Sequence, residues 1–343
     1  MRILIVSDAW TPQVNGVVTS LQALISQLRG MGHQVKLLSP GDFRSIPCPT
    51  YPEIPLVWNL WRVGPAIRAF QPDCVHLATE GPLGWAARRW LKKRNLAFSS
   101  AIHTRYPEYV STRCPLIPLS WGYAYLRHFH RPSQAVLVTT EHLRGEFFAR
   151  GLRQLKLWRK GVDCSLFKPL PVAGDAQSDP VFLYVGRLAA EKNLDAFLSL
   201  DLPGLKRVVG DGPQRHALQQ RYPRVEFCGY QHGHALAEAY QQASVLVFPS
   251  LTDTYGLVML EALACGTPVA AFAVRGPLDV LQQGITGYMH EDLGAACRQA
   301  LQLSREGCAR EAAKQSWTVS AHEFLAEQPL LDGELYMPSV LLT

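Results

Sequence analysis

Several kinds of segment are missing from this sequence of 343 residues, and each absence excludes a class of protein. No apolar run approaches the roughly 18–20 residues that a helix needs to cross a bilayer. The eight cysteines include no Cys-x-x-Cys pair, which argues against a zinc ribbon and against a disulfide framework. The chain opens directly on a strand-like run, Arg2–Ser7, without the basic and apolar regions of a secretory signal. We therefore expect a reduced, cytoplasmic protein.

Three sequence motifs are absent as well. No Gly-x-Gly-x-x-Gly follows the first strand-like run, which counts against a nicotinamide dehydrogenase. No Asp-x-Asp occurs, so we expect neither a metal ion nor any other cofactor. Basic and aromatic residues are not interleaved on any recognisable nucleic-acid-binding motif, and we expect no nucleic-acid partner.

The charge is unevenly divided along the chain. The first 160 residues hold 21 Lys and Arg against 8 Asp and Glu, a net of +13, whereas the remainder carries −7 within an overall charge of +6. Such asymmetry indicates that one half faces an anionic partner, although a solvated basic face would give the same count.

Short apolar runs alternate with helical stretches in both halves of the chain. Near-continuous β-branched runs between helices are typical of parallel strands covered on both faces. The expected strands are Ile3–Ser7, Gln34–Ser39, Cys74–Leu77, Ala97–Ile102 and Ala135–Thr139, then Phe182–Val185, Lys206–Val209, Val225–Cys228, Val245–Phe248 and Val269–Phe272. The pattern predicts two α/β domains with Rossmann-like parallel sheets.

Proline-rich segments suggest where these domains divide. Leu166–Pro180 has the composition of a linker, and Ser45–Pro55 that of a long loop. We expect a first domain over 1–163, a linker over 164–180, a second domain over 181–325 and an unassigned tail over 326–343.

The segment Thr252–Gly266 carries the strongest functional signal. A loop with Gly256 leads from a buried strand into a strongly apolar helix, and backbone N–H groups at a helix N-terminus attract phosphate. Glu261 is the only charged residue between Asp253 and Arg275. A buried carboxylate must be satisfied by a partner, and Glu261 lies about 7.5 Å along the helix from Gly256, within reach of a ribose. A structural carboxylate paired with a neighbouring loop is the alternative.

Weaker signals occur where other strands end. Arg187 and Lys192 place two cations between a strand and a helix, where they can grip phosphate or simply face solvent. The turn Gly210-Asp211-Gly212-Pro213 fits a loop passing close to a nucleotide, but turn chemistry alone also explains it. His103 follows another strand, where ligands of open α/β sheets bind, although a lone histidine is often structural.

Taken in order, these segments resemble the GT-B retaining glycosyltransferases of family 4, most closely the branch of sulfoquinovosyl- and mannosyl-transferases that act on lipids. The resemblance runs from Arg2 to about Leu325. It rests on Pro12–Val17, Ile102–Tyr109, Arg159–Asp163 with Phe167–Pro169, Val185–Arg187 with Glu191-Lys192, Gly210–Pro213 and the block Asp253–Gly266.

The resemblance implies two facing Rossmann-like domains, with the nucleotide diphosphate sugar bound mainly by the second and the acceptor by the first. It implies transfer of a hexose with retention and without an obligatory metal, through His103, Arg187, Lys192, Asp253 and Glu261. It places the nucleotide against Gly16, Gly210, Asp211, Gly212, Thr254, Tyr255, Gly256 and Leu257. The wider family has glutamate where this chain has Asp253, and the shorter side chain leaves the identity of the donor sugar open.

Two other functions stay possible on these residues. A non-hydrolysing sugar-nucleotide epimerase shares the fold but needs an acid/base pair beside the sugar, which we do not find. A catalytically silent sugar-nucleotide-binding protein would be expected to have lost some of the five catalytic residues.

A basic stretch in the first half points to the acceptor. Arg88, Arg89, Lys92, Lys93 and Arg94 alternate with Trp85, Trp90 and Leu91, which predicts a helix lying on an anionic membrane at the inner face of the cell membrane. A structural helix with a solvated basic edge is the alternative. A lipid such as a diacylglycerol or glycolipid is the expected acceptor.

Overall fold

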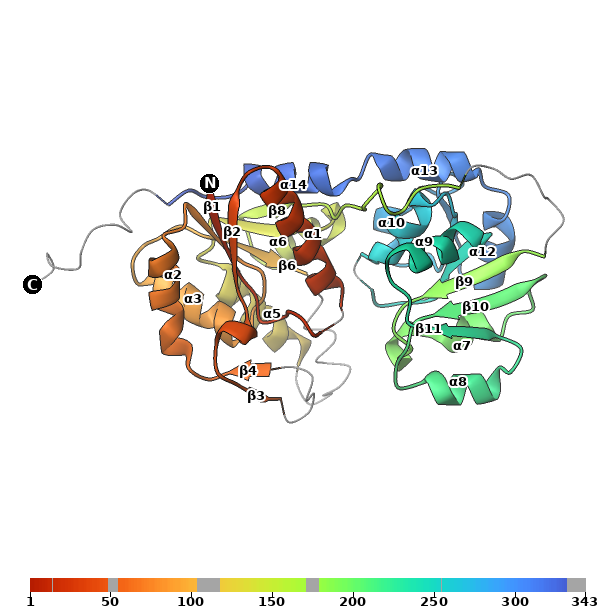
Figure 1. The fold of residues 1–343 in the computed structure, drawn as a ribbon, viewed down its shortest axis with the longest axis horizontal. Coiled ribbons are helices and arrows are strands. Elements are labelled where there is room, and N and C mark those ends of the chain that lie inside the picture. Colours follow the sequence, from red (N-terminus) through yellow and green to blue (C-terminus); the bar gives the residue numbers. More distant parts are fainter. Residues whose placement is uncertain (14, 49–54, 104–117, 171–178, 254, 332–343) are drawn as a thin grey trace, which may run out of the picture. The chain divides into compact units, whose positions relative to one another are not determined.

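The computed structural model describes residues 1–13, 15–48, 55–103, 118–170, 179–253 and 255–331. The chain divides into two compact units. Unit 1 comprises Met1–Arg159 together with the chain from Thr318 onward, and unit 2 comprises Lys160–Trp317. Each unit is built on its own six-stranded sheet, in red to yellow and in green to blue in Figure 1.

The sheet of unit 1 is parallel throughout, in the order β2-β1-β5-β6-β7-β8. Its strands are β2 (Gln34–Leu38), β1 (Arg2–Val6), β5 (Cys74–Leu77), β6 (Ser99–Ile102), β7 (Ala135–Val138) and β8 (Leu155–Leu157). Successive side chains of β1 point to opposite faces, so Ile3 and Ile5 enter one apolar core while Leu4 and Val6 enter another.

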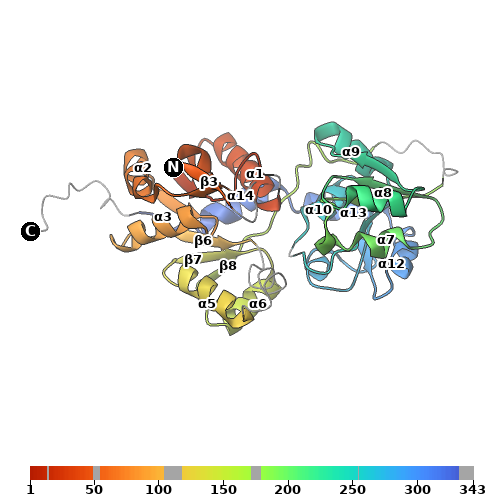
Figure 2. The same cartoon turned by 90° about the horizontal axis from the view of Figure 1, so that it is seen from below.

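Helices cover both faces of this sheet (Figure 2). One face packs against α1 (Gly16–Gly30) and α14 (Trp317–Ala326). The other packs against α2 (Val63–Phe70), α3 (Pro82–Lys92), α5 (Leu119–His130) and α6 (Glu141–Ala149). This double cover explains why the strand sequences are apolar without alternation.

The sheet of unit 2 is also parallel, in the order β11-β10-β9-β12-β13-β14. Its strands are β11 (Glu226–Gly229), β10 (Leu205–Val209), β9 (Val181–Val185), β12 (Val245–Phe248), β13 (Val269–Ala271) and β14 (Gly287–Met289). The helices are η3 (Ala190–Lys192), α7 (Leu194–Leu198), α8 (Arg215–Arg221), α9 (Gly233–Gln242), α10 (Leu257–Ala264), α11 (Pro277–Val280), α12 (Leu293–Ala300) and α13 (Arg305–Ala313). The two Rossmann-like sheets confirm the expected fold class.

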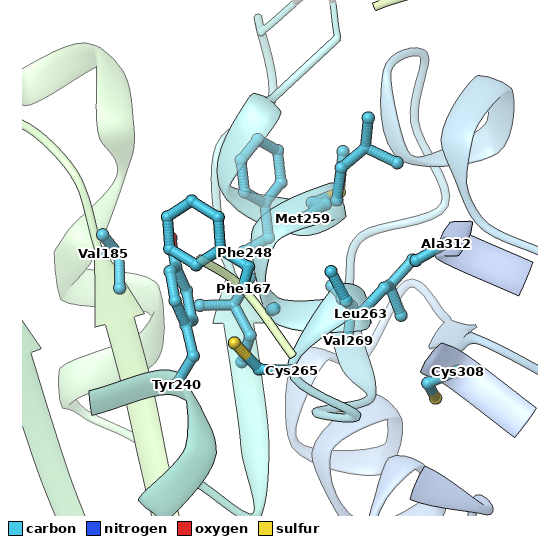
Figure 3. Packing of buried hydrophobic residues seen from close by; sticks show 14 of the residues in the cluster. Phe167, Val185, Tyr240, Phe248, Met259, Leu263, Cys265, Val269, Cys308 and Ala312 are labelled. Carbon is cyan, nitrogen blue, oxygen red and sulfur yellow. The ribbon is translucent and has the colours of Figure 1, made fainter. Parts of the chain in front are cut away.

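The strand β12 divides two cores in unit 2. Leu246 and Phe248 pack with α9, α10 and α13, and Figure 3 shows Tyr240 of α9 and Met259 of α10 in this core. Val245 and Val247 pack on the other face with α7, α8 and α12. The two cores hold the loops at the carboxyl ends of the strands in place.

The domain boundaries differ from those expected at 163 and 325. The helix α14 packs on unit 1, where Ala321 and Phe324 are fully buried and Trp158 Nε1 donates to Ser320 O at 3.1 Å. Ser99 Oγ donates to Gln328 Oε1 at 2.6 Å, so the expected tail also starts inside unit 1. Phe167 is buried in the core of unit 2, although it falls in the expected linker 164–180.

The segment Ser45–Pro55, expected as a loop, contributes to a small hairpin. β3 (Ser45–Pro47) pairs antiparallel with β4 (Pro55–Val57), and the pair lies apart from the six-stranded sheet (Figure 1). Two short 3₁₀ helices flank it, η1 (Pro40–Asp42) and η2 (Leu60–Arg62).

Candidate active site

The loops that leave β9 and β10 interlock at the carboxyl edge of the sheet of unit 2. Leu188 N donates to Asp211 O at 2.9 Å, and Gly186 N donates to Val209 O at 3.0 Å. Gly210 has φ +136°, and a Cβ there would lie 1.9 Å from the carbonyl oxygen of Gly186. Only glycine permits this approach, which brings two loops of the expected nucleotide site into direct contact.

Lys192 and Asp253 form an ion pair across this edge. Lys192 Nζ lies 2.6 Å from Asp253 Oδ1 and 2.8 Å from Oδ2, with both side chains about one-quarter exposed, at 24% and 25%. The neighbouring loop is braced, because Asn193 Nδ2 donates to Pro249 O at 3.2 Å. The structure thus joins two of the predicted catalytic residues from segments sixty-one residues apart.

Arg187 lies on the loop after β9 with its side chain exposed. The backbone of Arg187 is held in place by a hydrogen bond, since the hydroxyl of the buried Tyr184 donates to Arg187 O at 2.9 Å. Burial, with the nearby Asp253 and Glu191 charges, raises the pKa of Tyr184, so this hydroxyl stays protonated as a donor. The arrangement leaves the guanidinium of Arg187 available to an anionic ligand.

The helix α10 begins at this edge without a side-chain cap. Its N-cap residue is Gly256, at φ +70° and ψ 77°, and no described side chain accepts a hydrogen bond there. A Cβ on Gly256 would come within 2.9 Å of the Phe248 ring. The first-turn amides and the helix dipole therefore face the loop region where an anion is expected. Leu257, the first helical residue, packs partly against the core.

Glu261, one turn further along α10, is held by a residue that the sequence did not indicate. Tyr240, fully buried on α9, donates its hydroxyl to Glu261 Oε2 at 2.8 Å. Burial raises the pKa of Glu261 above its usual value, and the hydrogen bond from Tyr240 offsets only part of this increase. Within the described part of the chain, no lysine or arginine forms an ion pair with this carboxylate. One oxygen is thus occupied by Tyr240 while the other can meet a ligand.

Two other predicted nucleotide residues are engaged within the protein. The Tyr255 ring is buried, and its hydroxyl donates to Gln315 Oε1 at 3.0 Å. Asp211 accepts from Gly212 N and from the Arg215 guanidinium, both at 2.7 Å, which lowers its pKa. Within the protein, Tyr255 thus supports its loop and Asp211 holds its own turn, and the nucleotide contacts predicted for these two residues stay predictions. Thr254 lies outside the described residues.

Gly16 and His103 belong to unit 1. Gly16 starts α1, which Asn15 caps by accepting from Val17 N and Val18 N at 3.0 Å each. His103 follows β6, and its ring meets Trp158 edge-on at 5.7 Å between centroids. Both therefore lie at the carboxyl edge of the sheet of unit 1, where ligands of open α/β sheets bind.

The predicted basic membrane helix is corrected in one residue. Arg88 is buried, at 6% exposure, and donates to Phe129 O at 2.7 Å and His128 O at 2.6 Å at the end of α5. Trp85 donates to the Tyr125 hydroxyl at 2.7 Å. The remaining cations of the stretch are exposed, namely Arg89, Lys92, Lys93 and Arg94. Trp85 and Trp90 pack partly against the core and still border basic groups, since the Arg88 guanidinium lies 4.7 Å from the Trp85 ring centroid and that of Arg94 4.3 Å from the Trp90 ring centroid.

No cluster of three or more His, Cys, Asp or Glu side chains within the described residues has the arrangement of a metal site. None of the helices in this part of the chain combines the length and the apolar character that a bilayer crossing requires.

Comparison with known proteins relates both units to glycosyl transfer. Residues 14–166 match the family model described as "Glycosyltransferase Family 4". Residues 179–306 match the one described as "Glycosyl transferases group 1".

Relatives and a solved structure extend this comparison over nearly the whole chain. A GDP-mannose-dependent alpha-mannosyltransferase of Mycobacterium tuberculosis is 29% identical over 97% of each chain. The alpha-monoglucosyldiacylglycerol synthase of Streptococcus pneumoniae is 25% identical over 94% of this chain and 83% of that protein. Sucrose-phosphate synthase from Thermosynechococcus elongatus shares the fold, with a TM-score of 0.76 at 20% identity over 95% of this chain and 97% of that one.

Proposed function

The chain belongs to the family 4 glycosyltransferases, and on this premise we propose that it transfers a hexose from a nucleoside diphosphate sugar to a lipid with retention and without a metal ion. The observation that carries the proposal is the set of Arg187, Lys192 and the uncapped start of α10 at one edge of unit 2. The diacylglycerol in the name of one relative supports the lipid acceptor.

The diphosphate would bind where these positive groups converge. As the glycosidic bond breaks, negative charge develops on the leaving phosphate. Arg187, Lys192 and the first-turn amides of α10 would stabilise that charge, the task that a metal ion performs in other transferases. These cations are the basis for proposing metal independence.

The Lys192–Asp253 ion pair would rearrange when the donor binds. Both carboxylate oxygens of Asp253 accept from Lys192 Nζ, at 2.6 and 2.8 Å. A diphosphate carries more charge than one carboxylate and would compete for the ammonium group. Asp253 would then be free to accept hydrogen bonds from hydroxyls of the sugar, which makes it a determinant of donor choice.

Glu261 would bind the ribose of the nucleotide. A carboxylate whose second oxygen is fixed by Tyr240 presents its first oxygen in a defined direction. Ribose hydroxyls can donate to that oxygen, and hydrogen bonds to a charged group contribute about 1.5–3 kcal/mol each. His103 and Gly16, on unit 1, would serve the sugar and the acceptor, with His103 positioning a reactant rather than attacking it.

Thermal unfolding in the presence of UDP-, GDP- and ADP-sugars tests the donor site. A ligand at about one hundred times its dissociation constant stabilises a protein by about 2.7 kcal/mol. We expect one nucleotide class to raise the Tm of the wild type and to lose most of that effect in Lys192→Ala.

The matched control is Lys314→Ala, which breaks an exposed pair with Glu311 elsewhere on unit 2. Equal nucleotide stabilisation in Lys192→Ala, Lys314→Ala and wild type would remove the basis for this donor site. Incubation of the donor without acceptor, followed by analysis for an epimer, separates transfer from epimerisation.

A further inference from the structure

The hairpin between β2 and α2 presents apolar side chains to solvent. Ile46 is 55% exposed, Trp58 47% and Trp61 68%. The two tryptophan rings meet edge-on with centroids 5.5 Å apart. We call Ile46, Trp58 and Trp61, with the flanking Arg44 and Arg62, the docking hairpin.

The exposure of these residues does not result from a loose backbone. Trp58 N donates to Arg44 O at 3.1 Å, and Arg44 N donates to Asn59 Oδ1 at 3.0 Å. Asn59 and Val57 are buried. Alternate residues of this segment therefore anchor it to unit 1, while the tryptophans between them are held outward.

The docking hairpin is also cationic. Arg44 and Arg62 are both exposed, and Arg68 follows on α2. Glu53 is the only acidic residue in the sequence from Phe43 to Pro72. Tryptophan has an apolar ring with one polar N–H, which suits the boundary between lipid tails and headgroups, and nearby cations are attracted to anionic headgroups.

The position of the docking hairpin fits an acceptor that arrives from a bilayer. The hairpin follows η1 at the carboxyl end of β2, and ligands of such sheets bind at that edge. The exposed cations of α3 lie at the other edge. Asp8, just after β1, accepts from Leu83 N at 2.7 Å in the first turn of α3, so the helix runs from there toward the amino ends of the strands.

We propose that the docking hairpin is the membrane-binding surface of this protein and that its partner is an anionic phospholipid bilayer. Trp58 and Trp61 enter the headgroup region, while Arg44 and Arg62 contact lipid phosphates. The proposal rests on the lipid acceptor proposed above and names the surface through which that acceptor is reached. It replaces the basic end of α3 as the principal contact.

Sedimentation with vesicles tests this surface on the full chain. The vesicles are phosphatidylcholine alone, or phosphatidylcholine in which about one-third of the lipid is phosphatidylglycerol. Wild type is expected to bind the anionic vesicles. Because an aromatic side chain buries a large apolar area, Trp58→Ser/Trp61→Ser should lower the partition coefficient at least about tenfold. Brominated lipid should quench the fluorescence of wild type more than that of the double variant.

Two controls keep the result interpretable. Trp121→Ser removes a tryptophan that is 69% exposed on α5 of the same unit, and it should bind vesicles like wild type. Nucleotide-induced stabilisation, measured without lipid, shows that the double variant is folded, and it tests the donor site separately from the membrane surface.

Two results would overturn the proposal. Wild-type binding by Trp58→Ser/Trp61→Ser, with loss of binding when Arg89, Lys92, Lys93 and Arg94 are replaced by glutamine, would overturn the proposal in favour of α3. If wild type binds no vesicle but is still stabilised by nucleotide, the docking hairpin is not a membrane-binding surface, and the proposed donor site is unaffected.

Discussion

Replacement of Glu261 by glutamine should weaken the binding of nucleotide and at the same time stabilise the free protein. Glutamine keeps the shape of the side chain, and its Oε1 can still accept from the Tyr240 hydroxyl, which lies 2.8 Å from the carboxylate in wild type. The substitution removes the charge and replaces the other carboxylate oxygen by an NH2 group, which donates hydrogen bonds and cannot accept them. Its two effects have opposite signs because the charge is costly to bury and is used by the ligand.

The stabilising effect follows from the pKa of Glu261. Burial raises this pKa above its value in the unfolded chain, so the folded protein disfavours the ionised form. Glu261 therefore contributes stability at low pH that is lost as the pH rises through its folded pKa. At neutral pH, Glu261→Gln should raise the Tm, with each kcal/mol worth about 2–4 °C. The gain should shrink on acidification.

The loss of affinity follows from the hydrogen bonds to ribose. A hydrogen bond to a charged group contributes about 1.5–3 kcal/mol, so the dissociation constant should rise about 10- to 150-fold. Isothermal titration with the nucleoside diphosphate measures it, and Glu291→Gln, an exposed residue of unit 2, is the control. Unchanged affinity together with a lower Tm would show that Glu261 is a structural carboxylate.

Three further substitutions probe the same edge of unit 2. Asp253→Ala should abolish transfer but tighten the binding of a nucleoside diphosphate that lacks the sugar, because the substitution frees Lys192. Titration calorimetry measures this affinity, and weaker binding of the diphosphate would contradict the competition between carboxylate and phosphate. Gly210→Ala should destabilise by about 1–3 kcal/mol in denaturant titrations, since its φ is +136°, whereas Gly145→Ala, in α6 with open space, should be neutral or stabilising. Tyr240→Phe should move the acid limb of donor binding to higher pH, because the hydrogen bond that lowers the pKa of the neighbouring carboxylate is lost; an unmoved limb would assign Tyr240 to packing alone.

The sequence predicted most strands of the two sheets for physical reasons. Strands buried on both faces are apolar runs bounded by helices. The sequence alone therefore predicts β1, β5, β9 and β12. The edge strands β8 and β14 were missed because each has only three residues and contains Lys156 or Gly287, so that neither forms an apolar run. Glu261 was identified because one charge in a long apolar block needs a partner.

Contacts between distant segments could not be predicted in the same way. The pairing of Lys192 with Asp253 and of Tyr240 with Glu261 depends on how separate loops and helices pack. For the same reason the sequence did not place α14 on unit 1, where Trp158 and Ser320 meet across 162 positions. Sequence order alone groups α14 with unit 2, which precedes it in the chain, and not with unit 1.

The basic stretch around α3 shows a second limit of prediction from the sequence. Arg88 lies beside the buried row that includes Ala87 and Leu91, and its burial at the end of α5 follows from the helical period. Charge alone suggested a common exposed face for all five cations. The exposed tryptophans of the docking hairpin were not identified because Trp58 and Trp61 lie in a short segment without a periodic apolar pattern.

The central claim, retaining and metal-independent transfer to lipid, is tested most directly by one reaction. The purified protein is incubated with the nucleotide sugar selected by thermal unfolding and with vesicles containing diacylglycerol, in excess EDTA, and the anomeric configuration of the glycolipid is read by proton NMR. The account predicts a glycolipid with the configuration of the donor. An inverted product, or no product until a divalent metal is restored, would contradict it.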